Sequence, residues 1–228
     1  MLTWLPQNVS TFGGDVDHLF HIIYYITGVW FVAAELFLFY CLVRFHKSRQ
    51  AQPLYARGES SSQAAWVLVP VLVVLMLDLG IDKIGGDVWH RIKLELPPAG
   101  DQVHVTGKQF NWEFTYPGPD GKFGTADDQT IENELHVPVG TVVRFELSSK
   151  DVIHSFFVPA LRLKQDAMPG RTIKGWFEAT QPGTYEIACA ELCGFGHYGM
   201  HGVLTVHTAA DYQRWVQSTW GAAKAAAK

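Results

Sequence analysis

Two long apolar segments near the amino terminus constrain the fold more than any other feature of the sequence. Residues 19–45 are almost wholly apolar or aromatic, and a second apolar run covers residues 64–85. At a rise of ~1.5 Å per residue, a helix over the first run is longer than the ~30 Å hydrocarbon core of a bilayer. We therefore predict a hairpin of two transmembrane helices, over residues 19–45 and 64–85.

The charges around these runs predict the orientation of the hairpin. The linker, residues 46–63, is rich in basic side chains, whereas residues 1–18 contain aspartates and no lysine or arginine. Because basic loops stay in the cytoplasm, we expect the linker inside and both termini outside. No basic region precedes the first run and no small-residue cleavage site follows it, so we expect an uncleaved hairpin and not a signal peptide.

One acidic residue, Glu35, lies near the middle of the first run. A charge at the centre of a bilayer costs ~2.5–3.5 kcal/mol, so this side chain should face protein or carry a proton. Two roles remain open at this point. Glu35 handles protons or contacts another subunit, or it is a neutral, hydrogen-bonded acid at a helix interface.

Beyond the second run the sequence changes to short alternating or β-branched segments that are separated by turn residues. This spacing is typical of an all-β sandwich or barrel. Thr208 and Asp211 form a capping box for a short C-terminal helix. The expected strands are residues 103–106, 109–116, 131–137, 141–147, 153–158, 173–178, 184–188 and 203–206.

These patterns divide the chain into an extracytoplasmic β domain over residues 86–208 and a C-terminal helix and tail over residues 209–228. The domain contains an insert at residues 117–128 that is rich in Gly and Asp. Its spaced oxygens loosely resemble a calcium loop, but no glutamate closes it at the expected place. Its turn-forming composition favours a solvated hairpin tip over a calcium site.

Four metal-binding side chains fall within twelve residues of the β domain: Cys189, Cys193, His197 and Met200. Sulfur with imidazole selects copper, zinc or iron–sulfur, and a methionine among them favours copper in electron transfer. Two cysteines on one loop suit two copper ions bridged by both sulfurs, and His154 offers a second terminal imidazole. The alternative is a disulfide, which is plausible outside the cytoplasm but leaves the histidine and the methionine unexplained.

With these residues assembled, the chain resembles subunit II of the haem-copper cytochrome c oxidases. The resemblance covers the hairpin and the segments 151–159, 163–171 and 189–200. It implies a cupredoxin-like Greek-key sandwich that holds a binuclear copper centre, CuA. The backbone carbonyl of Glu191 would be a ligand, and its side chain would reach a magnesium ion shared with subunit I. The implied side-chain ligands are His154, Cys189, Cys193, His197 and Met200.

The resemblance further implies the electron-accepting subunit of a proton-pumping terminal oxidase. Electrons would come from a c-type cytochrome or a small copper protein and pass through CuA to subunit I, which reduces O₂ to water. No Cys-x-x-Cys-His motif follows the β domain, so we expect a separate donor. The other expected partners are further oxidase subunits and the lipid membrane, which the resemblance implies is the inner (plasma) membrane of a bacterium. A net charge of −4 gives no reason to expect a nucleic acid.

Two positions depart from the pattern of the family. The family usually has a tryptophan after Gly-x-Gln as the point where electrons enter, whereas Phe110 follows Gln109 here and Trp112 comes later. Electrons would then enter at Trp112, or Phe110 would form only a contact surface, and strand packing explains either aromatic equally well. Gln63 stands where members often carry an acid at the mouth of a proton channel, which leaves the proton route open.

Other functions are compatible with parts of this pattern. A membrane-anchored copper carrier or store would release copper readily to a chelator and would lack the mixed-valence spectrum of a sulfur-bridged pair. Nitrous oxide reductase uses the same copper pair but carries a large propeller domain. A quinol-oxidase subunit II shares the expected fold but lacks the cysteine pair.

Overall fold

The computed structural model describes residues 5–49, 52, 55 and 57–226. It separates into two compact units, Asp15–Trp89 and a second unit that combines Met1–Gly14 with His90–Lys228. Parts of the predicted linker and the last two residues of the expected tail lie outside the described residues. The predicted fold class is confirmed, with two long apolar helices followed by a β-sandwich and a short C-terminal helix.

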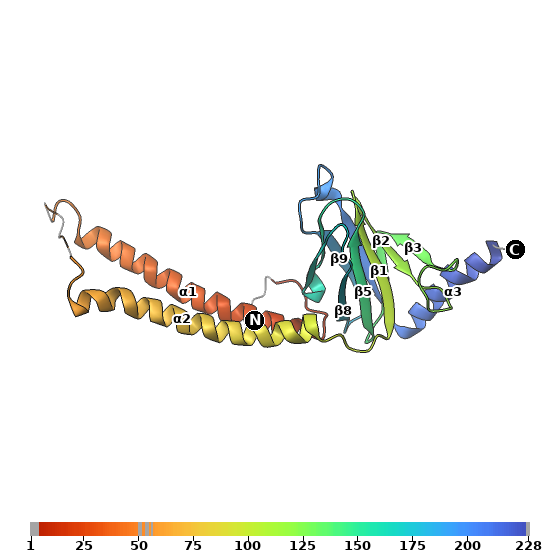
Figure 1. Ribbon diagram of the computed structural model, residues 1–228, viewed down its shortest axis with the longest axis horizontal. Coiled ribbons are helices and arrows are strands. Elements are labelled where there is room, and N and C mark those ends of the chain that lie inside the picture. The colour runs from red at the N-terminus through yellow and green to blue at the C-terminus, as the bar shows by residue number, and fades with distance from the viewer. Residues whose placement is uncertain (1–4, 50–51, 53–54, 56, 227–228) are drawn as a thin grey trace. The chain divides into compact units, whose positions relative to one another are not determined.

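The first unit is a pair of long apolar helices (Figure 1). Helix α1 spans Gly13–Arg44, and helix α2 spans Ser61–Trp89 and ends in a wider helical turn at His90–Leu94. Their most apolar windows have mean hydropathies of 2.0 and 2.4 and contain no buried residue, and both helices are long enough to cross a membrane. Pro70 lies inside α2, a position that membrane-spanning helices tolerate.

Helix α2 begins before the predicted residue 64 because polar side chains cap it ahead of the apolar run. The hydroxyl of Ser60 accepts a hydrogen bond from the backbone N–H of Gln63 at 3.3 Å. The side chain of Gln63 reaches back and accepts one from the N–H of Gly58 at 2.9 Å. This reciprocal arrangement is related to a capping box, so Gln63 has a structural role at the start of the helix.

The second unit contains a β-sandwich of two five-stranded sheets, ordered β3-β2-β1-β5-β8 and β4-β10-β9-β6-β7. Buried and less buried residues alternate along β2 and β5, as expected for strands with one face on a core. The core is rich in aromatic side chains, with Phe156 between Phe114 and Phe145. The strands are β1 Asp101–Lys108, β2 Asn111–Tyr116, β3 Gln129–Glu132, β4 Glu134–Pro138, β5 Val142–Ser149, β6 His154–Val158, β7 Leu163–Ala167, β8 Ile173–Glu178, β9 Gly183–Cys189 and β10 His201–His207.

The predicted strand 131–137 is wrong as a single element, because it is divided between β3 and β4, which belong to different sheets. The division falls at Asn133, whose φ of 59° is left-handed, a conformation that asparagine tolerates better than most residues. Its side-chain oxygen accepts the N–H of Trp112 at 2.9 Å, and its carbonyl accepts the N–H of Val203 at 2.7 Å. Asn133 therefore bonds to both sheets where the chain crosses between them.

Strand β7, Leu163–Ala167, was not among the predicted strands. It lies at the edge of its sheet and pairs antiparallel with β6, where Ala167 is opposite His154. Its central residues Lys164, Gln165 and Asp166 are polar, which hides the alternation that identifies a strand. Charged side chains are common on edge strands because they discourage pairing with another chain.

The segment before α1 packs on the sandwich. The N–H of Val9 donates to the carbonyl of Ala160 at 2.9 Å, and the carbonyl of Val9 accepts the N–H of Thr180 at 2.8 Å. Val9 is fully buried, and the buried ring of Phe12 meets Trp176 edge-on at 5.3 Å. The residues on the amino-terminal side of α1 therefore belong to the same compact unit as the domain that follows α2.

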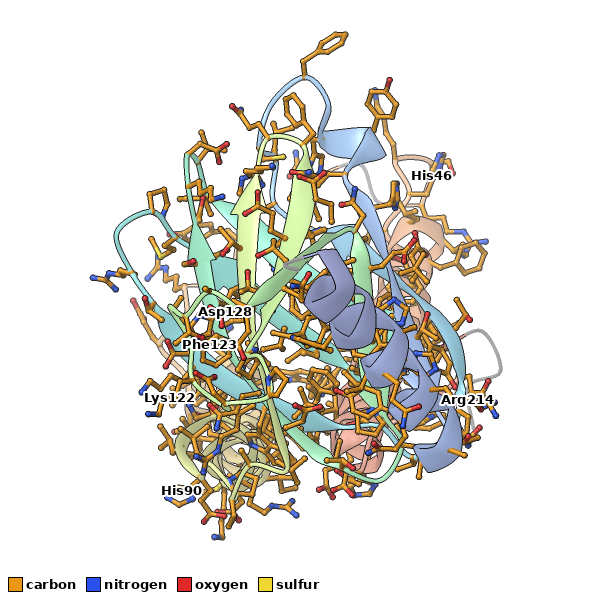
Figure 2. The ribbon with its side chains drawn as sticks, turned by 90° about the vertical axis from the view of Figure 1, so that its right-hand side faces the viewer. His46, His90, Lys122, Phe123, Asp128 and Arg214 are labelled. Carbon is orange, nitrogen blue, oxygen red and sulfur yellow. The ribbon has the colours of Figure 1, made fainter. Side chains whose placement is uncertain are left out.

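The insert at residues 117–128 connects β2 and β3 and forms turns (Figure 2). The Asp120 carboxylate accepts the N–H of Lys122 at 2.8 Å, and the Asp128 carboxylate accepts the N–H of Gly124 at 2.7 Å. These bonds are the ones expected of a hairpin tip. Within the described parts of the chain, its aspartates belong to no group of three or more potential metal-binding side chains.

Helix α3, Ala209–Ala226, begins at the predicted capping box, since Thr208 and Asp211 hydrogen-bond to each other. It packs on the second sheet through a cluster of aromatic and imidazole rings. His136 and His207 approach with Nδ1 and Nε2 2.9 Å apart, and Trp215 stacks on the His136 ring at 4.7 Å. One nitrogen of this pair must donate and the other accept, so the contact requires an imidazole with a free lone pair.

We predict that this histidine pair makes the fold less stable at acidic pH. Burial lowers the pKa of both histidines; the charge of His136 lowers that of His207 further, and Glu134 partly offsets the effect at His136. The folded state therefore favours neutral rings, and its free energy of unfolding should fall as pH drops below the unfolded value of about 6.5. The thermal midpoint of the purified protein between about pH 8 and about pH 5 measures this.

A double variant isolates the contribution of the pair. His136→Asn with His207→Asn should lower the midpoint at about pH 8 but flatten its decline towards about pH 5. His104→Asn is the matched control, because it removes a histidine that stacks on Phe123 instead, and it should keep the wild-type decline. An equally steep decline in the double variant would show that other groups cause it.

Candidate metal centre

Two paired strands bring the predicted ligands together at one end of the sandwich. His154 is the first residue of β6, and Cys189 is the last residue of β9. The two strands are antiparallel neighbours, with Phe156 opposite Cys189. The loop that leads from β9 to β10 carries the remaining ligands and projects from this end, at the top of the sandwich in Figure 1. The sheet therefore places His154 beside a loop that follows it by thirty-five residues.

All five predicted side chains converge around the two thiols. The sulfurs of Cys189 and Cys193 are 3.9 Å apart, and both cysteines are free. His154 Nδ1 lies 3.9 Å from the Cys189 sulfur. His197 Nδ1 and Met200 Sδ lie 3.6 and 3.8 Å from the Cys193 sulfur. A disulfide bond is ~2.05 Å long, so the alternative of a Cys189–Cys193 disulfide does not describe this structure.

Four of the five ligand side chains are buried, and His197 is half-buried. His154 and Met200 are fully buried, and Cys189 and Cys193 are 8% and 4% exposed. Burial and the adjacent Cys189 thiol raise the pKa of Cys193 to about 11. A thiolate at Cys193 therefore needs a nearby positive charge, which a metal ion provides.

The donor set fits copper. Thiolate, thioether and imidazole together are soft ligands. A metal–thiolate bond is ~2.3 Å long, so an ion can contact both sulfurs at their observed separation of 3.9 Å. His154, Cys189 and Cys193 alone place three potential ligand atoms within 4.8 Å of one another. The cluster is therefore a candidate copper site that needs no rearrangement of the backbone.

Glu191 contributes its backbone to the cluster, because the Cys189 thiol contacts the Glu191 carbonyl at 3.2 Å. Its side chain is exposed, and among the described residues it belongs to no group of three or more potential metal-binding side chains. Magnesium prefers about six oxygen ligands. The expected magnesium ion is therefore not supported by this chain alone.

Asp151 orients the buried histidine. One carboxylate oxygen lies 2.8 Å from His154 Nε2, which leaves Nδ1 directed at Cys189. Such a carboxylate fixes the tautomer and the ring orientation of a metal-binding histidine. Asp151 also accepts the backbone N–H groups of Gln109 and Val152, both at 2.7 Å. Although its partial burial alone would raise the pKa of Asp151, these hydrogen bonds hold that pKa below its ordinary value.

The turn between β1 and β2 was predicted only as a place where electrons enter, but it also positions the ligand loop. The side-chain amide of Gln109 donates to the carbonyl of Cys193 at 2.6 Å. Phe110 rests on Gly196, where a Cβ atom would be only 2.5 Å from the ring. Gly107 has a similar role, since a Cβ there would be 2.8 Å from the His154 ring. Glycine at these two positions lets a ring approach the backbone closely, and in the sequence these glycines are the only indication of the contacts.

The two aromatic candidates for electron entry, Phe110 and Trp112, differ in exposure. Phe110 is 38% exposed, whereas Trp112 is fully buried. Trp112 packs edge-on against His154 and Phe156, with ring centroids 6.0 and 5.4 Å away. Trp112 is therefore a core residue behind the cluster, and its ring does not reach the surface of this chain.

Comparisons with known proteins identify the family. Residues 102–207 match the family described as cytochrome c oxidase subunit II, periplasmic domain. The crystal structure of the periplasmic domain of subunit II of the Bradyrhizobium japonicum cytochrome oxidase aligns with a TM-score of 0.49 and 33% identity, covering 55% of this chain and 96% of that one.

Two relatives align over nearly the whole chain. An alternative cytochrome c oxidase subunit 2 from Bradyrhizobium diazoefficiens is 34% identical, over 94% of this chain and 83% of the relative. A cytochrome c oxidase subunit 2 from a Synechocystis species is 31% identical, over 93% of this chain and 74% of the relative. On these sequence matches, the chain belongs to the cytochrome c oxidase subunit II family.

Proposed function

We propose that this protein is the electron-accepting subunit of a membrane-bound terminal oxidase and that its metal cluster is a binuclear CuA centre. The convergence of two free, buried thiols with two imidazoles and a thioether carries the proposal. When bound, the copper pair would accept one electron at a time from a donor and pass it to subunit I, for the reduction of O₂ and the coupled pumping of protons. The proposed ligands are His154, Cys189, Cys193, His197, Met200 and the carbonyl of Glu191.

The chain's own contribution is to hold these ligands in place before an electron arrives. The N–H of Cys189 donates to the carbonyl of Met200 at 3.1 Å, which closes the ligand loop. The N–H of Ala190 donates to the carbonyl of Ser155 at 3.0 Å, which ties the loop to β6. Ligands supported in this way need little rearrangement when the charge of the site changes, and this favours fast electron transfer.

The burial of the ligands also favours a resident centre over a copper carrier. A carrier must expose its ligands so that a partner can exchange the metal. Here His154 and Met200 are fully buried, and Phe110 lies against the glycines of the loop. The tightly packed ligands support electron transfer as the function.

We propose that electrons enter this subunit at Phe110 and the adjacent tip of the ligand loop. Phe110 is partly exposed, rests on Gly196, and follows Gln109, whose side chain bonds to the Cys193 carbonyl. Only the ring of Phe110 would then separate a donor that touches it from the backbone of the ligand loop. Trp112 packs behind His154 and supports that ligand from inside the core.

We further propose that α1 and α2 cross the membrane with the sandwich on the periplasmic side. The segment before α1 and the domain after α2 form one compact unit, so both must lie on the same side of the bilayer. The basic linker would then be cytoplasmic. Glu35 is exposed on α1; because lipid is a costly environment for an acid, we assign it to a contact with another oxidase subunit.

Replacing one bridging sulfur tests the copper pair. Cys193→Ser should abolish the visible absorption of a sulfur-bridged copper pair and should reduce donor oxidation to background, because a hydroxyl is a poor ligand for copper. The circular dichroism spectrum should stay that of the wild type. Cys41→Ser is the matched control, since this third cysteine lies in α1, and it should change neither signal. Wild-type turnover in Cys193→Ser would refute the electron-accepting role.

Truncating the exposed aromatic tests the contact point. Phe110→Ala should lower kcat/KM for donor oxidation by about tenfold, because loss of an aromatic anchor at an interface costs about 1–2 kcal/mol. The copper spectrum should be unchanged. Phe123→Ala is the control, because Phe123 stacks on His104 away from the ligand loop. If both variants oxidise the donor at the wild-type rate, electrons enter elsewhere.

A further inference from the structure

The ligand loop presents an apolar surface to solvent. Leu192, Phe195 and Tyr198 are 78%, 95% and 80% exposed, although they lie between buried metal ligands. Phe110 adjoins them, because its ring rests on the backbone of Gly194 and Gly196 on either side of Phe195. We call Phe110, Leu192, Phe195 and Tyr198 the loop patch. Single exposed apolar residues are common, but several on one short loop indicate a binding surface.

Four charged side chains lie beside Phe110 and form one ion-pair network, the charged quartet of Lys108, Glu113, Glu132 and Lys150. Lys108 is 2.6 Å from Glu113 and 2.9 Å from Glu132. Lys150 is 2.5 Å from the other oxygen of Glu113. Two positive and two negative charges therefore cancel within the network.

The backbone fixes the quartet next to the loop patch. Lys108 and Asn111 are paired residues that flank the turn carrying Phe110. The N–H of Lys150 donates to the carbonyl of Gly107 at 3.0 Å. Glu113 and Glu132 face each other on β2 and β3. The quartet therefore forms the polar border of the Phe110 side of the patch.

The pKa values of Lys108 and Glu113 are shifted, and both shifts favour the charged forms. The hydrogen bonds to Glu113 and Glu132 raise the pKa of Lys108. Partial burial opposes ionisation of Glu113, but the hydrogen bonds and charges of Lys108 and Lys150 outweigh it and lower the pKa of Glu113. The negative charges of Glu113 and Glu132 are therefore balanced by lysines of the same chain.

The other acid of this region, Asp151, is also engaged. Its oxygens accept hydrogen bonds from the N–H groups of Gln109 and Val152 and face His154 Nε2. It is therefore directed inward to the cluster. On the Phe110 side of the patch, Glu113, Glu132 and Asp151 therefore offer no free carboxylate to a positively charged partner. The acid of the ligand loop, Glu191, is exposed beside Leu192.

We propose that the electron donor is a redox protein whose contact face is apolar and nearly uncharged around its redox group, and that it docks on the loop patch with little electrostatic steering. The inference rests on the proposed function and narrows the class of partner. A donor ringed by lysines gains its rate from unpaired acids on the oxidase, and here the acids on the Phe110 side of the patch are paired with lysines. Apolar contact close to the ligands would instead supply the affinity.

The salt dependence of donor oxidation tests this directly. The purified oxidase complex would be mixed with two reduced probes, a c-type cytochrome with a lysine-ringed haem edge and one with an uncharged haem edge. From about 0.01 M to about 0.3 M ionic strength, the second-order rate constant should change less than about twofold with both probes. The uncharged probe should react faster. A decrease of about tenfold or more with the lysine-ringed probe would overturn the proposal.

A single charge variant provides a gain-of-function test. Lys150→Gln leaves the Lys108–Glu113 pair in place and frees one negative charge beside the patch. It should raise the rate with the lysine-ringed probe by about threefold at low ionic strength, and salt should remove the gain. Lys174→Gln is the matched control, because it breaks the Lys174–Glu146 pair at 3.5 Å, away from the patch, and should show no gain. A gain equal in both variants, or absent from Lys150→Gln, would overturn the proposal.

A patch variant tests the apolar contact itself. Phe195→Ser should lower the rate with the uncharged probe by about tenfold at every ionic strength, with the copper spectrum unchanged. If Phe195→Ser reacts at the wild-type rate, or if it loses the other oxidase subunits on purification, a partner subunit covers the patch. Either result would overturn the proposal. Absence of copper or of any donor oxidation in the wild type would refute the proposed function instead, so the two failures are distinguishable.

Discussion

Two thiols are buried side by side at the end of the sandwich, 3.9 Å apart and without a bond between them. In these buried surroundings the pKa of Cys193 is raised, so this thiol does not ionise readily. A cation that binds both sulfurs stabilises the ionised forms. The two imidazoles and the thioether directed at the same sulfurs complete a soft donor set that suits copper. The surrounding packing is understandable as the support of this one arrangement.

The sandwich provides that support through short connections. The pairing of β6 with β9 brings His154 to Cys189, and Asp151 turns the histidine ring so that Nδ1 faces the sulfur. The β1–β2 turn reaches over the ligand loop through the bond from Gln109 to the Cys193 carbonyl. The same turn exposes Phe110, so the ligand support and the surface contact belong to one element. Glycine is needed where the turn and the loop approach each other, because a Cβ atom there would meet the Phe110 ring.

Patterns that are local in sequence predicted much of this structure. Hydropathy located both helices, the capping box located α3, and the residue types of the Cys-His-Met loop predicted a cluster of metal-binding side chains, which the structure brings together. Features that depend on partners distant in sequence could not be read in this way. The sheet change at Asn133 depends on bonds to Trp112 and Val203, and the burial of Trp112 depends on His154 and Phe156. The polar edge strand β7 carries no alternation, and the pairing of Lys150 with Glu113 requires a known sheet register.

The proposed copper pair can be tested by electron paramagnetic resonance of the purified oxidase complex, combined with its copper content per subunit II. We expect two copper ions per chain and a hyperfine pattern in which one unpaired electron is shared equally by two copper nuclei. A pattern from a single copper nucleus, or a protein in which Cys189 and Cys193 are joined as a disulfide with no copper bound, would contradict it.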